Sequence, residues 1–122
     1  MPTITASVIL DGMVKTVTPG DLVELAATQS VDLIDVREPG EWDAGYIHGA
    51  RLLPLAQLRA DPDAALPRDT PLVFICAKGV RSMQAAKLAE RLGHDRVYQL
   101  AGGTKEWARA GMPLVSGLQA AA

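Results

Sequence analysis

Residues 71–92 constrain the fold of this chain more than any other stretch. The first five are a short apolar run that is rich in strand-forming side chains. The last ten place apolar side chains at the i, i+3, i+4, i+7 spacing of one helix face. These side chains are Ala85, Leu88, Ala89 and Leu92. We therefore expect a buried strand, a six-residue turn over residues 76–81, and a helix.

Cys76, the only cysteine of the chain, lies where the strand becomes the turn. The first N–H groups of a helix have no partner within it, and the helix dipole adds partial positive charge there. Lys78 and Arg81 add two cations, and Gly79 can adopt the positive φ that turns successive N–H groups inward. A cysteine that only fills a core is the alternative, but it needs none of these groups. We therefore interpret Cys76 as a reactive thiol with a lowered pKa.

Strand and helix patterns alternate through most of the chain. Thr18, Pro19 and Asp21 are typical of a helix start, and we expect a helix as far as Thr28. Its inner face would consist of Leu22, Leu25 and Ala26. Further strands are expected at residues 31–36, 51–53 and 96–100, a helical turn at 41–44, a loose helical segment at 55–59, a surface connection at 61–67 and a last helix at 102–110. The alternation predicts an α/β fold with a parallel sheet and helices on both faces. Ligands of such folds bind at the carboxyl ends of strands, where Cys76 and Asp35 are expected to lie.

The length of 122 residues is typical of one domain. Asp11 and Gly12 separate two strand-like runs at residues 3–10 and 13–17, which predicts a hairpin. A loosely held N-terminal arm is the alternative. We expect residues 1–17 to be an extension packed on a domain of residues 18–115, and residues 116–122 to be a flexible tail.

The composition excludes several classes of partner and site. The net charge is −2, with acidic and basic residues interspersed, so we expect neither nucleic acid nor an anionic membrane surface as partner. One cysteine cannot form a disulfide framework or a CxxC metal site. No apolar run approaches the roughly 18 residues of a membrane span, and no leader pattern stands at the N-terminus. We expect a cytoplasmic protein.

The turn from Cys76 to Ser82 resembles the active-site loop of rhodanese domains, the sulfurtransferase family. Three further stretches resemble family motifs in the family's order, namely residues 33–42, residues 45–50, and residues 100–103 followed by Trp107, Gly111 and Pro113. The resemblance covers residues 18–115 and implies a five-stranded parallel sheet. It also implies transfer of a sulfane sulfur through a Cys76 persulfide, with no metal and no cofactor. The N–H groups of Ala77, Lys78, Gly79, Val80 and Arg81 would then point at the terminal sulfur.

The resemblance also suggests roles for side chains around the loop. Lys78 would meet an anionic donor such as thiosulfate, and Arg81 would orient either the loop or the donor. Asp35 and Arg37 would form an ion pair that supports the loop. Glu41 stands where two-domain relatives have a donor-binding arginine, which makes thiosulfate a doubtful physiological donor.

Four aromatic or imidazole side chains in these motifs are expected to have structural roles. We interpret Trp42 and Trp107 as core anchors. Tyr46 and His48 are interpreted as packing or turn residues rather than as a general base.

The expected partners are a small-molecule sulfur donor and an acceptor, which is cyanide in vitro or a protein thiol; the protein would be a monomer or a homodimer. One alternative is a non-catalytic rhodanese-like module that binds a partner, but such modules usually lack the cysteine. Another is a phosphatase or arsenate reductase of the same fold. Those enzymes have five residues between cysteine and arginine, whereas four separate Cys76 from Arg81.

Overall fold

A computed structural model describes residues 14–116, which form a five-stranded parallel sheet in the order β1-β5-β4-β2-β3. The strands are β1 (Val14–Val17), β2 (Asp32–Asp35), β3 (Arg51–Leu52), β4 (Leu72–Ile75) and β5 (Val97–Leu100). The expected α/β fold is confirmed. β1 is an edge strand paired with β5, so residues 14–17 belong to the sheet. The expected partner strand at residues 3–10 and the tail at residues 117–122 lie outside the described residues.

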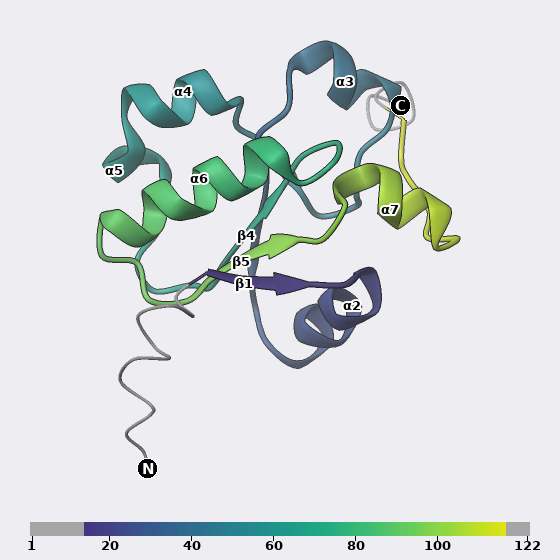
Figure 1. Ribbon diagram of the computed structural model, residues 1–122, viewed down its shortest axis with the longest axis horizontal. Helices are drawn as coiled ribbons and strands as arrows, with labels where there is room; N and C mark the ends of the chain where they lie inside the picture. The colour runs from purple at the N-terminus through teal and green to yellow at the C-terminus, as the bar shows by residue number, and fades with distance from the viewer. Residues whose placement is uncertain (1–13, 117–122) are drawn as a thin grey trace.

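Helices cover both faces of the sheet (Figure 1). They are α2 (Pro19–Thr28), α3 (Pro39–Ala44), α4 (Leu55–Ala60), α5 (Pro62–Ala65), α6 (Val80–Arg91) and α7 (Gly103–Arg109). One core cluster joins the sheet to α4 and α6, and a second joins the opposite face to α2 and α7. Side chains of β4 alternate between the two clusters, as the twofold period of a strand requires. No helix within residues 14–116 has the length and apolar character needed to cross a membrane.

The N-terminus of α2 follows from its sequence. Thr18 accepts a hydrogen bond from the Asp21 N–H, and Asp21 accepts one from the Thr18 N–H in return. Pro19 occupies the first turn, where its missing N–H is not needed. Leu22 faces the core as expected. Ala26 lies on the same side of α2 and lines an apolar cavity there, so it remains exposed.

Two loops are more ordered than the sequence predicts. α6 begins at Val80, so Val80 and Arg81 belong to its first turn rather than to a six-residue loop. Gly79 caps this helix with φ of +100°, and this left-handed residue turns the chain straight into the helix. Residues 61–67 are not simply a surface connection. They contain α5, and Leu66, only 4% exposed, packs in the core.

The two tryptophans have different environments. Trp107 is buried in the cluster beneath α2 and α7, as expected of a core anchor. Trp42 is half-buried and stacks on Tyr46, with ring centroids 3.8 Å apart and planes within 6°. The expectation that Trp42 anchors the core is therefore wrong. The aromatic pair instead stiffens the segment that connects α3 to the following turn.

Candidate active site

Cys76 lies directly after β4, at the carboxyl edge of the sheet, and is only 1% exposed. Its Sγ accepts a hydrogen bond from the Gly79 N–H at 3.0 Å. The Ser82 hydroxyl oxygen lies 3.4 Å from Sγ, because the first turn of α6 brings Ser82 back over the cysteine. The strand end and the helix start therefore converge on one sulfur atom, as the sequence predicts.

Two opposing effects determine the pKa of Cys76. Burial raises it, because a charged sulfur loses hydration. Hydrogen bonds from the side chain and backbone of Ser82 lower it, and the N–H groups of Gly79 and Lys78 add to this effect. The pKa is lowered overall from its ordinary value of 9.0, which is the direction expected from the sequence. A larger fraction of the Cys76 thiol is therefore ionised at a given pH than in a free cysteine.

A cavity of about 340 Å³ opens above the thiol. It is lined by Glu41, Cys76, Ala77, Lys78, Val80, Arg81 and Lys105. Five of these are loop or α6 positions expected from the sequence, and Glu41 comes from α3. Lys105 was not anticipated. It follows β5 in the first turn of α7, so the shared carboxyl edge of a parallel sheet was the one signal that could have placed it here.

An ion pair crosses the rim of this cavity. Both terminal nitrogens of Arg81 donate to the Glu41 carboxylate, at 2.7 and 2.9 Å. Arg81 lowers the pKa of Glu41 from 4.5 to about 2, and Glu41 in turn raises the pKa of Arg81. Glu41 also accepts the Glu38 N–H at 3.0 Å, which fixes the carboxylate at the start of α3. The Arg81 charge is therefore already paired, whereas the side chains of Lys78 and Lys105 form no hydrogen bond or ion pair within residues 14–116.

Asp35 and Arg37 form a buried ion pair beside the site. Arg37 donates from Nε and Nη2 to the Asp35 carboxylate, at distances of 2.8 to 3.1 Å. The same guanidinium donates to the carbonyls of Glu41 and Gly45, at 3.3 and 2.8 Å. The pair therefore holds the middle and the C-terminal end of α3. It reaches the cysteine loop only indirectly, through the Glu41 side chain and Arg81.

The first turn of α7 fixes the back of the cysteine loop. The Thr104 N–H donates to the Cys76 carbonyl at 2.8 Å, and the Lys105 N–H donates to the Ala77 carbonyl at 3.1 Å. Gly103 makes this approach possible, because a Cβ there would lie 2.5 Å from the Ala77 carbonyl carbon. With both carbonyls turned toward α7, the following N–H groups are free to face the sulfur.

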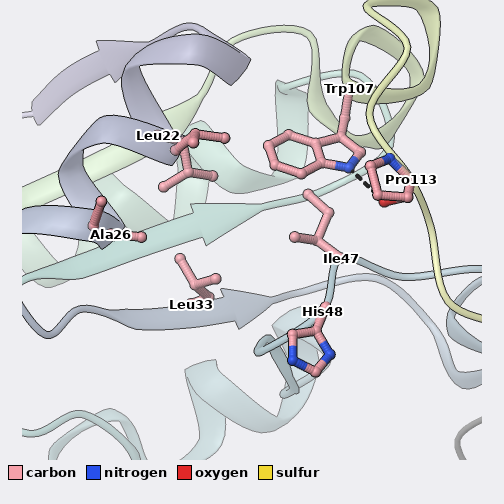
Figure 2. A pocket seen from close by; sticks show the side chains of 9 residues that line it. Leu22, Ala26, Leu33, Ile47, His48, Trp107 and Pro113 are labelled. Atoms are coloured by element: carbon pink, nitrogen blue, oxygen red, sulfur yellow. Dashed lines mark hydrogen bonds between the residues drawn. The ribbon is translucent and has the colours of Figure 1, made fainter.

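A second cavity, of about 330 Å³, lies on the opposite face of the sheet between α2 and α7. Its lining is mostly apolar, and Figure 2 shows Leu22, Leu33, Ile47 and Trp107 around it, with His48 at its edge. The Trp107 indole donates to the Pro113 carbonyl at 2.8 Å (Figure 2). His48 is exposed in a turn, as the sequence predicts, and does not line the Cys76 cavity.

Comparison with known proteins is consistent with this site. Residues 18–110 match the rhodanese-like domain family. The chain belongs to this family. Among its members, a protein of Allochromatium vinosum named sulfurtransferase is 39% identical over 92 residues, covering 75% of this chain and 85% of the relative. The thiosulfate sulfurtransferase GlpE of Shewanella oneidensis is 33% identical over 99 residues, covering 79% and 94%. Both of these relatives are named as sulfurtransferases.

Solved structures give the same fold. A rhodanese-related protein of Thermoplasma volcanium superposes with a TM-score of 0.75 at 32% identity, covering 83% of this chain and 97% of that one. A Rhodopseudomonas palustris protein of unknown function, described as a possible tyrosine phosphatase, gives 0.75 at 30% identity, covering 94% and 96%.

Some relatives are longer than the region matched. The chain covers 64% of the Bacillus subtilis protein YqhL, at 40% identity. It covers 26% of the Mycobacterium tuberculosis protein named "Probable adenylyltransferase/sulfurtransferase MoeZ", at 37% identity. The family therefore includes both single-domain proteins and larger proteins that contain this domain.

Proposed function

We propose that this rhodanese-like domain transfers a sulfane sulfur from a donor to a thiophilic acceptor, and that Cys76 carries the sulfur as a persulfide. The observation that supports this most directly is the setting of the thiol. Sγ lies at the floor of a cavity of about 340 Å³ and accepts the Gly79 N–H at 3.0 Å. A thiol whose pKa is lowered by its own loop needs no separate general base to act as a nucleophile.

The proposed reaction has two steps that balance without a cofactor. The Cys76 thiolate attacks the outer sulfur of a donor such as thiosulfate. A Cys76 S–S bond forms, the donor's S–S bond breaks, and the electron pair leaves with sulfite. An acceptor such as cyanide or a thiol then attacks the outer sulfur of the persulfide. The bond to Cys76 breaks, and the thiolate returns to its starting state.

The charges around the cavity favour an anionic donor held away from Arg81. Lys78 and Lys105 line the cavity and can attract a sulfonate or carboxylate. Arg81 is already engaged by two hydrogen bonds to Glu41, so a donor would have to compete with that carboxylate to reach it. Glu41 also repels a dianion directly. We therefore propose that thiosulfate is a weak donor, and that persulfides whose negative charge lies farther from the reacting sulfur are better ones.

The decisive experiment follows sulfur on the cysteine. The protein is incubated with thiosulfate, mercaptopyruvate or glutathione persulfide, and intact mass spectrometry should show one added sulfur atom on Cys76. Cyanide should then remove that sulfur and yield thiocyanate. Cys76→Ala, the matched control, should give neither product, because this is the only cysteine of the chain.

Each other outcome points to a different function. Absence of the persulfide with all three donors would overturn the proposal and favour a module that only binds a partner. Hydrolysis of an aryl phosphate that depends on Cys76, without persulfide formation, would favour the oxyanion chemistry of the phosphatases.

A further inference from the structure

Behind the thiol, on the side away from the cavity, polar side chains form a continuous chain. Ser82 Oγ lies 3.4 Å from Cys76 Sγ and donates to Gln99 Oε1 at 2.8 Å. Gln99 Nε2 donates to Thr16 Oγ1 at 3.0 Å. Thr16 and Gln99 are register partners of β1 and β5, so their side chains share the sheet face covered by α6. These hydrogen bonds therefore connect the reactive sulfur to β1, at the edge of the sheet.

This row of hydrogen-bonded side chains has too few protons to satisfy the thiol and the thiolate in one arrangement. A serine hydroxyl has one proton to donate. In the geometry described, that proton goes to Gln99, and the Cys76 thiol donates to Ser82. A thiolate has no proton, so it needs the Ser82 proton for itself. Ser82 is 0% exposed, and water therefore cannot replace the partner that would be lost.

We propose that Gln99 is a positioning residue for Cys76, whose side-chain amide rotates by half a turn when the thiol ionises. The rotation exchanges Oε1 and Nε2 without moving the heavy-atom positions of the amide. Nε2 then donates to Ser82 Oγ, and Ser82 donates to the sulfur. At the other end, Oε1 accepts the hydroxyl proton of Thr16. Each hydrogen bond in this row therefore has one donor and one acceptor in both orientations of the Gln99 amide.

The surroundings of Gln99 suit this exchange. Gln99 is 5% exposed, so its amide depends on the protein for partners. Thr16 is exposed, and its hydroxyl can turn between the solvent and the amide at little cost. Oε1 also lies 3.7 Å from the position a Cβ of Gly79 would take, so the amide packs behind the residue whose N–H meets the sulfur. A hydrophobic side chain at position 99 would fill this space without supplying a partner.

Other charged groups lie around the thiol and must remain constant in any test. They are Glu41 of α3, Lys78 of the loop, Arg81 of α6 and Lys105 of α7, which line the cavity, and the Asp35–Arg37 pair after β2. None of them is changed by substitution at position 99. Differences in the Cys76 midpoint between variants at that position therefore come from the hydrogen bonds of Ser82, Gln99 and Thr16.

The test measures the rate of Cys76 alkylation against pH, followed by mass spectrometry. Gln99→Glu supplies only acceptors and holds the Ser82 proton, so the midpoint should rise by about one pKa unit or more. Gln99→Met deprives the Ser82 proton of its acceptor in the thiol state, whereas in the thiolate state the sulfur still accepts that proton, so the midpoint should fall. Gln84→Met, at an exposed position of α6, is the matched control and should leave the midpoint unchanged.

A Ser82→Ala background separates this mechanism from charge and packing. Because Gln99 acts through the Ser82 hydroxyl, Gln99→Met should have no effect on the midpoint there, and Gln99→Glu should have a smaller effect than in the wild-type background. Shifts of the same sign for both substitutions would overturn the proposal. So would a Gln99→Met shift that persists after Ser82→Ala, even if Gln99→Glu failed to fold. The measurement reads ionisation rather than sulfur transfer, so this inference and the proposed function can fail separately.

Discussion

Gly103 lies where the first turn of α7 packs against the peptide that follows Cys76. A Cβ at position 103 would lie 2.5 Å from the Ala77 carbonyl carbon and 2.6 Å from its oxygen, and closer still to the Cys76 carbonyl oxygen. Contacts of this kind essentially never fall below 3.0 Å, so Gly103→Ala requires a displacement of more than 0.5 Å. The atoms in the way belong to the backbone and cannot rotate aside.

The cost of this substitution has two parts. An alanine at φ of +63° loses about 1–2 kcal/mol in the left-handed region. Overpacking against the loop adds about 1–3 kcal/mol. The loop cannot yield freely, because the Cys76 and Ala77 carbonyls accept the Thr104 and Lys105 N–H groups. A shift of half an ångström in the thiol should also slow its reactions on the order of tenfold.

Gly111→Ala is the matched control. Gly111 also has a positive φ, +86°, but a Cβ at this position would have no atom within 4 Å. Gly111→Ala should therefore lose only the free energy that a left-handed alanine costs. Urea unfolding gives the free energy of unfolding of each variant, and the alkylation rate of Cys76 at fixed pH gives the loop geometry. Equal losses of stability for the two variants, with unchanged alkylation in both, would refute the reasoning.

Three further predictions concern charged groups. Glu41→Gln should free Arg81 and remove a repelling charge, so the KM for thiosulfate should fall severalfold in a thiocyanate assay. The KM for cyanide, the acceptor in that assay, should change less. Burial, and next the charge of Arg68, lowers the pKa of His94 below 6.5, so the unfolded state binds a proton that the folded state does not. Urea unfolding should therefore show stability falling as the pH drops through 6.5, and His94→Leu should reduce that slope; an identical slope would contradict the assignment. Asp35→Asn should leave the Arg37 charge buried without its partner and lower the free energy of unfolding by about 3–5 kcal/mol, measured in the same way.

The parts of this molecule that depend on local chemistry could be predicted from the sequence. The start of α2 follows from the reciprocal hydrogen bonds of Thr18 and Asp21, which lie three residues apart. The approach of Cys76 to Gly79 likewise depends on a short loop between β4 and α6. In both cases the interacting groups are neighbours in the chain, so spacing alone carries the information.

Contacts between distant segments could not be predicted in this way. Lys105 lines the cavity only because β5 lies next to β4 in the sheet. Gln99 meets Thr16 across 83 residues, through the pairing of the first and last strands. Trp42 has the size of a core residue, yet its partner is Tyr46 at the surface of the domain. Nothing in the local pattern distinguishes these outcomes from the alternatives.

The order β1-β5-β4-β2-β3 also governs when this domain can finish folding during synthesis. β1 emerges from the ribosome long before β5, the strand with which it pairs within residues 14–116. The carbonyls of Cys76 and Ala77 similarly lack their donors until Thr104 and Lys105 have been made. Because domains fold as units once their segments are available, a nascent chain would carry an ordinary cysteine until its last segments emerge. The two hydrogen bonds that hold the back of the cysteine loop would therefore form only after α7 has been made.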